Sequence, residues 1–182
     1  MVVVRQIPNV ITGLRILCVP YLISMIFLQQ FVQALLLVLA MGLSDSLDGF
    51  LARNYGWQTR LGAILDPVAD KLMILALFVS FGILHWVPWW IVSLIALRDV
   101  FLLLGVVYLQ CSINDFYIQS LLISKLNTLM QIVLGIVLIF SQLSVVNSQI
   151  LSTLMIIVAC TTFASAVQYY KLGLRLVRRV AQ

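Results

Sequence analysis

Six apolar runs, each close to 20 residues long, dominate this sequence. A helix of about 20 apolar residues spans the hydrocarbon core of a bilayer, whereas soluble domains seldom contain even one such run. The pattern therefore predicts an all-α integral membrane protein, with residues 1–182 forming a single domain. We expect its six transmembrane helices at residues 9–29, 32–53, 62–84, 88–110, 118–141 and 148–172.

The overall composition agrees with this class of protein. Hydrophobic residues make up 63% of the chain and charged residues 9%, which excludes an ordinary soluble domain. The net charge is +5. In so apolar a chain, anionic lipid headgroups are the expected partners of this charge, and we expect no nucleic acid partner.

Lysine and arginine predict the orientation in the membrane. The connections after the first, third and fifth runs contain neither residue, whereas both ends of the chain and the region around residues 53–60 are basic. By the positive-inside rule, both termini and the second and fourth connections lie in the cytoplasm. The opening residues lack the features of a signal or transit peptide. We therefore expect a bacterial cytoplasmic membrane rather than a mitochondrial inner membrane.

Four of the six acidic residues lie between positions 45 and 70. Asp45 and Asp48 are three residues apart and Asp66 and Asp70 are four apart, so each pair shares one helix face. Carboxylates inside a membrane segment are costly and usually functional. Because a short connection joins the two helices, we expect both pairs to meet in one cavity at the cytoplasmic interface.

Such a cavity favours metal-assisted phosphoryl chemistry. Carboxylate oxygens without nearby Cys or His select Mg²⁺ or Mn²⁺, and four carboxylates suit two ions. Gly49, Ala52 and Gly62 leave room for a ligand or a neighbouring backbone. Arg53 offers a planar pair of donors for a phosphate.

Two other interpretations of these aspartates were weighed. They could cap helices or pair with Arg53, Arg60 and Lys71, which fits two of them better than four. They could also belong to an ion or proton transporter, but a translocation path needs polar groups at several depths. The outer half of every predicted helix is apolar, which argues against transport.

The motif itself resembles that of a known family. The spacing D-x2-D-G-x2-A-R-x8-G-x3-D-x3-D, from residue 45 to residue 70, is similar at every fixed position to the signature of the CDP-alcohol phosphotransferases. The resemblance implies six transmembrane helices in each protomer of a homodimer. It also implies a site, open to the cytoplasm, that joins a CDP-linked lipid to an alcohol and releases CMP.

The resemblance assigns roles to the motif residues. Asp45, Asp48 and Asp66 would bind the metal ions, and Asp70 would complete the metal site and act as the general base. The remaining motif positions would line the CDP pocket together with Asp48: Gly49, Ala52, Arg53 and Gly62.

The first predicted helix adds a second likeness. Asn9, Thr12 and Arg15 form an N-xx-T-xx-R pattern similar to that of phosphatidylglycerophosphate synthases and cardiolipin synthases. Asn9 and Thr12 would then belong to the CDP-binding residues. An N-cap asparagine and an arginine that extends to the membrane surface are the alternative interpretation.

Two later segments concern the acceptor. Arg98-Asp99 and the stretch around Lys125 and Asn127 resemble the eukaryotic-type cardiolipin synthases more than the phosphatidylglycerophosphate synthases, which have a second lysine where this chain has Asn127. Phosphatidylglycerol carries one negative charge and needs fewer cations than glycerol 3-phosphate. We therefore expect Arg98, Lys125 and Asn127 to bind the acceptor, and CDP-diacylglycerol and phosphatidylglycerol to be the substrates. Phosphatidylglycerophosphate synthesis is the alternative, and Arg98 could instead form an ion pair with Asp99 or Asp115.

Overall fold

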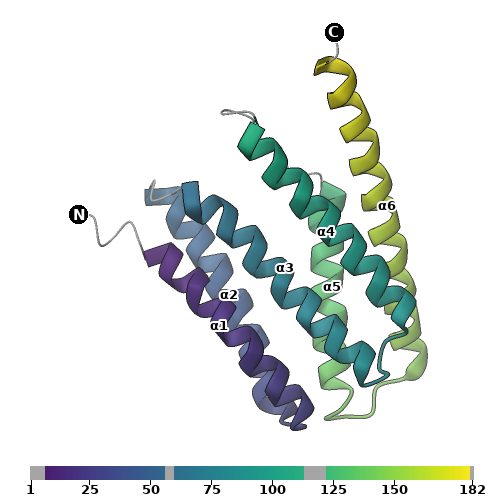
Figure 1. Cartoon of the computed structure of the whole chain (residues 1–182). Helices are drawn as coiled ribbons and strands as arrows, with labels where there is room; N and C mark the ends of the chain where they lie inside the picture. The colour runs from purple at the N-terminus through teal and green to yellow at the C-terminus, as the bar shows by residue number, and fades with distance from the viewer. Residues whose placement is uncertain (1–6, 56–59, 113–121, 181–182) are drawn as a thin grey trace.

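A computed structural model describes residues 7–55, 60–112 and 122–180, with side chains at 12–44, 68–104 and 122–171. Within these ranges the chain forms six α-helices and no strand, which confirms the all-helical prediction (Figure 1). The helices are α1 (Ile7–Phe27), α2 (Phe31–Tyr55), α3 (Arg60–Ile83), α4 (Trp89–Ser112), α5 (Leu122–Phe140) and α6 (Ser148–Val180).

The observed helices follow the apolar runs closely. The main difference is α6, which continues to Val180, past the predicted end at residue 172. Its last turns have the sequence LGLRLVRRV, in which leucine and arginine are good helix formers despite the loss of apolar character. The predicted start of the fifth helix, at residue 118, lies outside the described residues.

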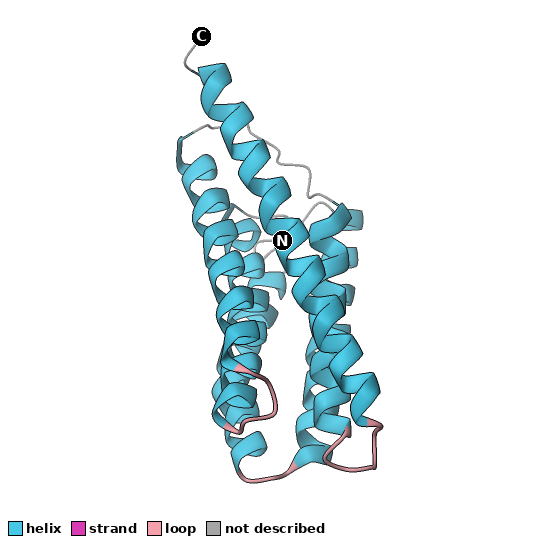
Figure 2. Cartoon of the chain, turned by 90° about the vertical axis from the view of Figure 1, so that its right-hand side faces the viewer, coloured by secondary structure: helices cyan, strands magenta, loops and turns pink. Residues whose placement is uncertain are grey.

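Successive helices run in opposite directions, and both ends of the chain lie at the same end of the bundle (Figure 1). The loops drawn in pink lie at the opposite end, as Figure 2 shows. Helix α1 packs on α2 and α3, α3 also contacts α4 and α5, and α6 packs on α4 and α5, while α2 contacts α5. Helix α3 is therefore central, and it carries the second aspartate pair.

The interior is filled by large apolar side chains from four helices, α1, α3, α4 and α5. Phe78 and Phe81 of α3 are almost fully buried and meet edge to face, with ring centroids 5.8 Å apart. Phe81 also stacks on Trp86 at 5.4 Å. The other large side chains that are almost fully buried are Leu22, Ile26, Ile74, Ile91, Ile95, Leu134, Leu138 and Ile139.

Two helices end in the same way at the end of the bundle away from the termini. Gln29 follows α1 and His85 follows α3, and each has a left-handed backbone with φ of 59°. The next amide, of Gln30 or Trp86, donates to the carbonyl five residues earlier, at 2.8 and 2.9 Å respectively. This is the Schellman arrangement, which satisfies the last carbonyls of a helix and turns the chain sharply.

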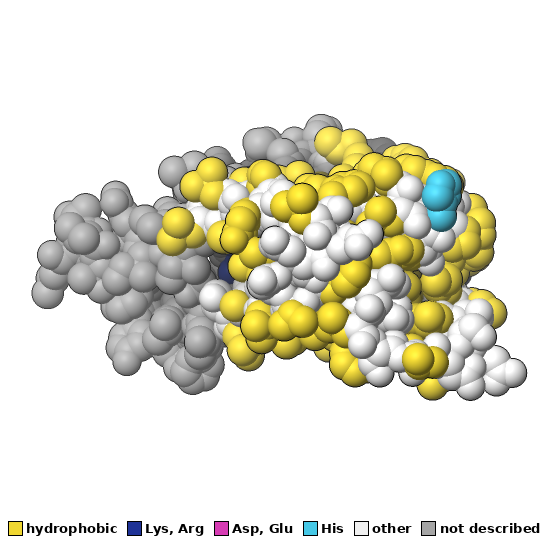
Figure 3. All heavy atoms as spheres, turned by 90° about the horizontal axis from the view of Figure 1, so that it is seen from below, with side chains coloured by type: hydrophobic (Ala, Val, Ile, Leu, Met, Phe, Trp, Pro, Cys, Tyr) yellow, Lys and Arg dark blue, Asp and Glu magenta, His cyan; other side chains and the backbone are white. Residues whose placement is uncertain are grey.

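Within the part of the chain that the structure describes, two helices are long and apolar enough to cross a membrane by length and composition, at Leu122–Phe140 and Ser148–Lys171. Shorter apolar stretches occupy Thr12–Phe27 and Phe31–Ser44. Figure 3 views the bundle from the end away from the termini. Its coloured atoms are almost entirely apolar or neutral, apart from His85, the single histidine, and a small area of basic atoms. The described atoms visible on this face are thus mostly uncharged.

Candidate active site

The four aspartates of the motif lie on two consecutive helices, as predicted. Asp45 and Asp48 belong to α2, and Asp66 and Asp70 to α3. Only four residues separate the two helices, so the end of α2 and the start of α3 are at most about 18 Å apart. The side chains of the other predicted metal and CDP residues lie outside the described residues: Asp45, Asp48, Asp66, Gly49, Ala52, Arg53, Gly62 and Asn9.

Asp70, the predicted general base, faces α1. Its Oδ1 accepts a hydrogen bond from Nη1 of Arg15 at 3.0 Å. The Arg15 side chain is 3% exposed and that of Asp70 is 35% exposed. Thr12, one helical turn before Arg15, is also buried. Arg15 therefore does not extend to the membrane surface but points inward and fixes the carboxylate from the neighbouring helix.

The donor set fits a hard divalent cation. The motif offers carboxylate oxygens alone, which suit Mg²⁺ or Mn²⁺, and Asp70 remains partly accessible beside its ion pair. Within the described side chains no group of three ligating residues occurs, since three of the four aspartates lie outside them. The ligand set of Asp45, Asp48, Asp66 and Asp70 thus stays a prediction.

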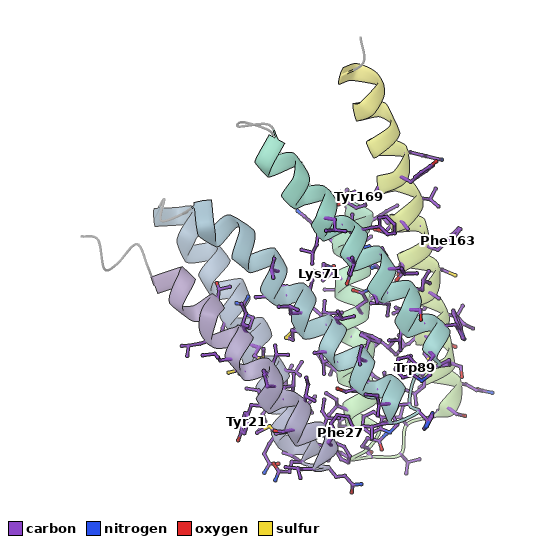
Figure 4. All side chains as sticks on the ribbon, in the orientation of Figure 1. Tyr21, Phe27, Lys71, Trp89, Phe163 and Tyr169 are labelled. Atoms are coloured by element: carbon purple, nitrogen blue, oxygen red, sulfur yellow. The ribbon has the colours of Figure 1, made fainter. Side chains whose placement is uncertain are left out.

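Lys71, the next residue on α3, turns away from α1 and connects α3 to α4 and α5 (Figure 4). Its Nζ donates to Oδ1 of Asp99 on α4 at 3.2 Å and to Oγ1 of Thr128 on α5 at 3.3 Å. The same Asp99 oxygen accepts from Nη1 of Arg98 at 2.5 Å. One buried carboxylate therefore holds two cations, as paired burial of charge requires.

All three guanidinium nitrogens of Arg98 donate hydrogen bonds. Nε and Nη2 donate to Oγ of Ser165 on α6 at 3.2 and 2.7 Å, and Nη2 also donates to Oγ of Ser124 on α5 at 2.7 Å. Its side chain is 1% exposed. The ion pair with Asp99, the alternative considered from the sequence, is therefore present, and an acceptor role for Arg98 stays a prediction.

Asn127, the second predicted acceptor residue, faces α6. Its Oδ1 accepts hydrogen bonds from the hydroxyls of Thr161 and Thr162 at 2.9 and 2.8 Å. The residue is fully buried, as is Gln131 one turn later on the same face. The structure thus separates Asn127 from Lys125, which is exposed.

Lys125 lines an open groove of about 340 Å³ along α5. The groove brings it together with Lys71, which sequence reasoning had not assigned to the acceptor site. Its walls are made of Lys71, Ser124, Lys125, Thr128, Leu129 and Ile132.

Several polar residues of this network were missed from the sequence. Ser124 and Thr128 are four residues apart in α5, which places them on one helix face. Ser165 lies three and four residues after Thr162 and Thr161 in α6, so these polar residues also share one helix face. A polar stripe in an otherwise apolar helix is the signal that could have indicated them, because such groups need partners away from lipid.

Comparison with known proteins decides the family. Residues 5–165 match the model of the CDP-alcohol phosphatidyltransferase family, a stretch that includes the aspartate motif and the groove. The chain belongs to the CDP-alcohol phosphatidyltransferase family. This confirms the resemblance drawn from the motif spacing.

Relatives within the CDP-alcohol phosphatidyltransferases fall into the two groups named above. The human "Cardiolipin synthase (CMP-forming)" is 34% identical over 94% of this chain and 63% of its own length. A "Probable phosphatidylglycerophosphate synthase" of Mycobacterium tuberculosis is 33% identical over 60% of this chain and 54% of its own length. The Escherichia coli "CDP-diacylglycerol--glycerol-3-phosphate 3-phosphatidyltransferase" is 36% identical over 47% of this chain and 48% of its own length. The chain thus spans less than two thirds of each of these relatives.

Together, family, composition and the two long apolar helices identify a membrane protein. The aspartate motif lies on α2 and α3, and the charged network around Asp99 joins α3 to α4, α5 and α6.

Proposed function

We propose that this chain is a cardiolipin synthase, which transfers the phosphatidyl group of CDP-diacylglycerol to phosphatidylglycerol and releases CMP. The observation that carries the proposal is the similarity to cardiolipin synthases along 94% of the chain, with the aspartate motif intact. A second candidate is phosphatidylglycerophosphate synthesis from glycerol 3-phosphate, supported by relatives that align over a shorter part of the chain.

The residues divide the chemistry between them. Asp45, Asp48, Asp66 and Asp70 would hold two divalent ions, Mg²⁺ or Mn²⁺, which when bound neutralise negative charge on the phosphates. Asp70, held by Arg15 at 3.0 Å, accepts the proton of the acceptor hydroxyl. The hydroxyl oxygen then forms a bond to the lipid-side phosphorus, and the pyrophosphate P–O bond breaks to release CMP.

The donor nucleotide occupies the space between α1, α2 and α3 in this proposal. Asp48 contributes to the CDP pocket as well as to the metal site. Arg53 pairs with the pyrophosphate, since a guanidinium offers two parallel donors to a phosphate. The remaining CDP-binding residues are proposed to be Asn9, Thr12, Gly49, Ala52 and Gly62.

The protein would form a homodimer in which each protomer spans the membrane six times. The active site and both termini would face the cytoplasm. The common end of the two termini (Figure 1) and the scarcity of charge at the opposite end (Figure 3) support this orientation. Basic residues near the termini would contact anionic lipids.

The test is an assay with purified protein in detergent. CDP-diacylglycerol, Mg²⁺ or Mn²⁺ and one acceptor at a time are supplied, and CMP and lipid products are separated. Cardiolipin with phosphatidylglycerol is the expected product. Formation of phosphatidylglycerophosphate without any cardiolipin would establish the second candidate. If no CMP is released with either acceptor, both candidates are excluded.

A transporter that uses the same carboxylates is a remote third possibility. It predicts cation or proton flux in proteoliposomes without CDP-diacylglycerol. We expect no flux, because a path would need polar groups at several depths and the core near the end away from the termini is apolar.

A further inference from the structure

The groove along α5 has a charged part and an apolar part. Lys71 and Lys125 line the charged part, and Leu129 and Ile132 line the apolar part. From Lys125 to Ile132 the helix rises about 10 Å. The apolar part therefore extends from the lysines toward the end of the bundle away from the chain termini. Leu129 is 53% exposed, which leaves this part of the groove open at its side.

The charge of the groove is not balanced by the residues around it. Among the described side chains, Lys71, Arg98 and Lys125 are opposed by the single carboxylate of Asp99, because Asp70 is paired with Arg15. Three cations against one anion leave a local charge of +2. Such a cluster suits an anion, and a phosphodiester is the anion that a phospholipid headgroup carries.

Lys71 is better placed than Arg98 to meet that anion. The Arg98 guanidinium is buried and committed to Asp99, Ser124 and Ser165. Lys71 lines the groove, and Asp99 and Thr128 accept two of its three N–H groups. A lysine so oriented retains one donor, whereas Lys125 forms no ion pair with the residues that the structure describes.

We propose that this groove binds the acceptor as an intact anionic phospholipid, and that Leu129 and Ile132 determine specificity for it. The phosphodiester lies between Lys71 and Lys125, and one acyl chain follows the two apolar side chains. This inference rests on the proposed function and adds the residues that select a lipid acceptor.

Selectivity follows from the shape of the groove and not from hydrophobic burial alone. An acyl chain is already in apolar surroundings in the bilayer, so moving it onto Leu129 changes its environment little. The open apolar side lets the headgroup reach the lysines without drawing the chain through polar groups, which would be costly. Glycerol 3-phosphate has no chain and gains nothing from Leu129 or Ile132.

Binding is tested first, without donor or metal. Phosphatidylglycerol with a diazirine in one acyl chain is photolysed with the purified protein in mixed micelles, and the labelled peptide is identified. We expect labelling of the segment around Leu129 and Ile132, reduced at least fivefold in Lys125→Gln and in Lys71→Gln. Equal labelling of wild type and both lysine variants would overturn the proposal.

Kinetics with each acceptor test specificity. Leu129→Gln and Ile132→Gln are expected to lower kcat/KM for dioleoyl phosphatidylglycerol about tenfold, because each introduces a polar amide that the acyl chain must cover without providing a hydrogen-bond partner. KM for CDP-diacylglycerol should change less than twofold. The matched control is Leu126→Gln, because Leu126 is equally exposed on α5 and does not line the groove.

The outcomes separate this inference from the proposed function. Labelling in the groove, without CMP release from CDP-diacylglycerol when phosphatidylglycerol is supplied as acceptor, would retain the lipid site and reject the synthase. If Leu129→Gln and Ile132→Gln leave cardiolipin formation unchanged, the groove is rejected as the acceptor site. The same holds if these variants raise only the KM for CDP-diacylglycerol. Melting temperatures of all variants identify any loss caused by misfolding.

Discussion

At the scale of single residues, the pairing of Asp70 with Arg15 defines the proposed general base. A carboxylate with one oxygen held at 3.0 Å by a buried guanidinium has a fixed orientation, which proton transfer requires. We predict that Asp70→Asn lowers CMP release by at least about 10²-fold, the lower end of the contribution of general acid–base catalysis. The rate is measured with saturating CDP-diacylglycerol.

The Asp70→Asn variant keeps the side-chain volume and an oxygen that can accept from Arg15, but it removes the carboxylate that faces this buried guanidinium, which lowers stability. Its melting temperature in detergent is therefore compared with that of wild type. Asp115→Asn, the same change in the connection before α5, is the control and should keep normal activity. Near-normal turnover in Asp70→Asn would show that another group takes the proton.

The spacing of the motif predicted Asp70 but not its partner. Positions three or four apart share a helix face, so the aspartates could be paired from the sequence alone. Arg15 lies 55 residues before Asp70, and Ser165 lies 67 residues after Arg98. Periodicity tells which face a residue occupies, but not which helix packs against that face, and these contacts therefore required the structure.

At the scale of helices, the Arg98 network joins α4 to α5 and α6. Removing one member of a buried ion pair leaves the other without compensation, at a cost of about 3–5 kcal/mol. Because Lys71 still compensates Asp99 in Arg98→Leu, we predict a loss below this range, which comes from the hydrogen bonds to Asp99, Ser124 and Ser165 and is seen as a lower midpoint of thermal unfolding in detergent. Ser165→Ala should lose only about 1 kcal/mol.

Activity measured on the same variants tests the acceptor role expected for Arg98. If Arg98→Leu keeps its melting temperature but no longer uses phosphatidylglycerol, Arg98 binds the acceptor and the network is not primarily structural. A common decrease in stability and in turnover with every acceptor would support the structural role.

Asn127 offers a second test of a helix contact. Its carboxamide is buried against Thr161 and Thr162 on α6, so a lysine there would place an unpaired ammonium in the interior. We predict that Asn127→Lys lowers the unfolding midpoint more than Leu122→Lys, at an exposed position on the same helix. Unchanged stability with better use of glycerol 3-phosphate would instead show that residue 127 contacts the acceptor.

The helices themselves were largely predictable, for a physical reason. Apolar runs must form helices in a bilayer, where backbone groups have no other partners, and most of the six runs matched within a few residues. The exception is the end of α6, where apolar character stops before helix propensity does. The contacts of Lys71 with α4 and α5 were missed, because its position in the sequence grouped it with the basic residues Arg53 and Arg60 around the second connection.

At the scale of the whole molecule, the arrangement of the helices predicts where each connection lies. The two chain ends share one end of the bundle, and the connection between α5 and α6 lies at the other (Figures 1 and 2). Val145 in that connection is fully exposed. If all six helices span the membrane with the basic ends in the cytoplasm, Val145 faces the outside and Gln182 the inside.

Single cysteines test this topology directly. Cys18, Cys111 and Cys160 are replaced by serine, and Val145→Cys or Gln182→Cys is introduced into that background. In intact cells an impermeant maleimide should label only the Val145→Cys protein, whereas Gln182→Cys should react only after the membrane is opened, because the bilayer separates the two ends of the bundle. Labelling of both positions in intact cells would mean an even number of spans between them, and the reverse pattern would place the aspartate site on the outer side.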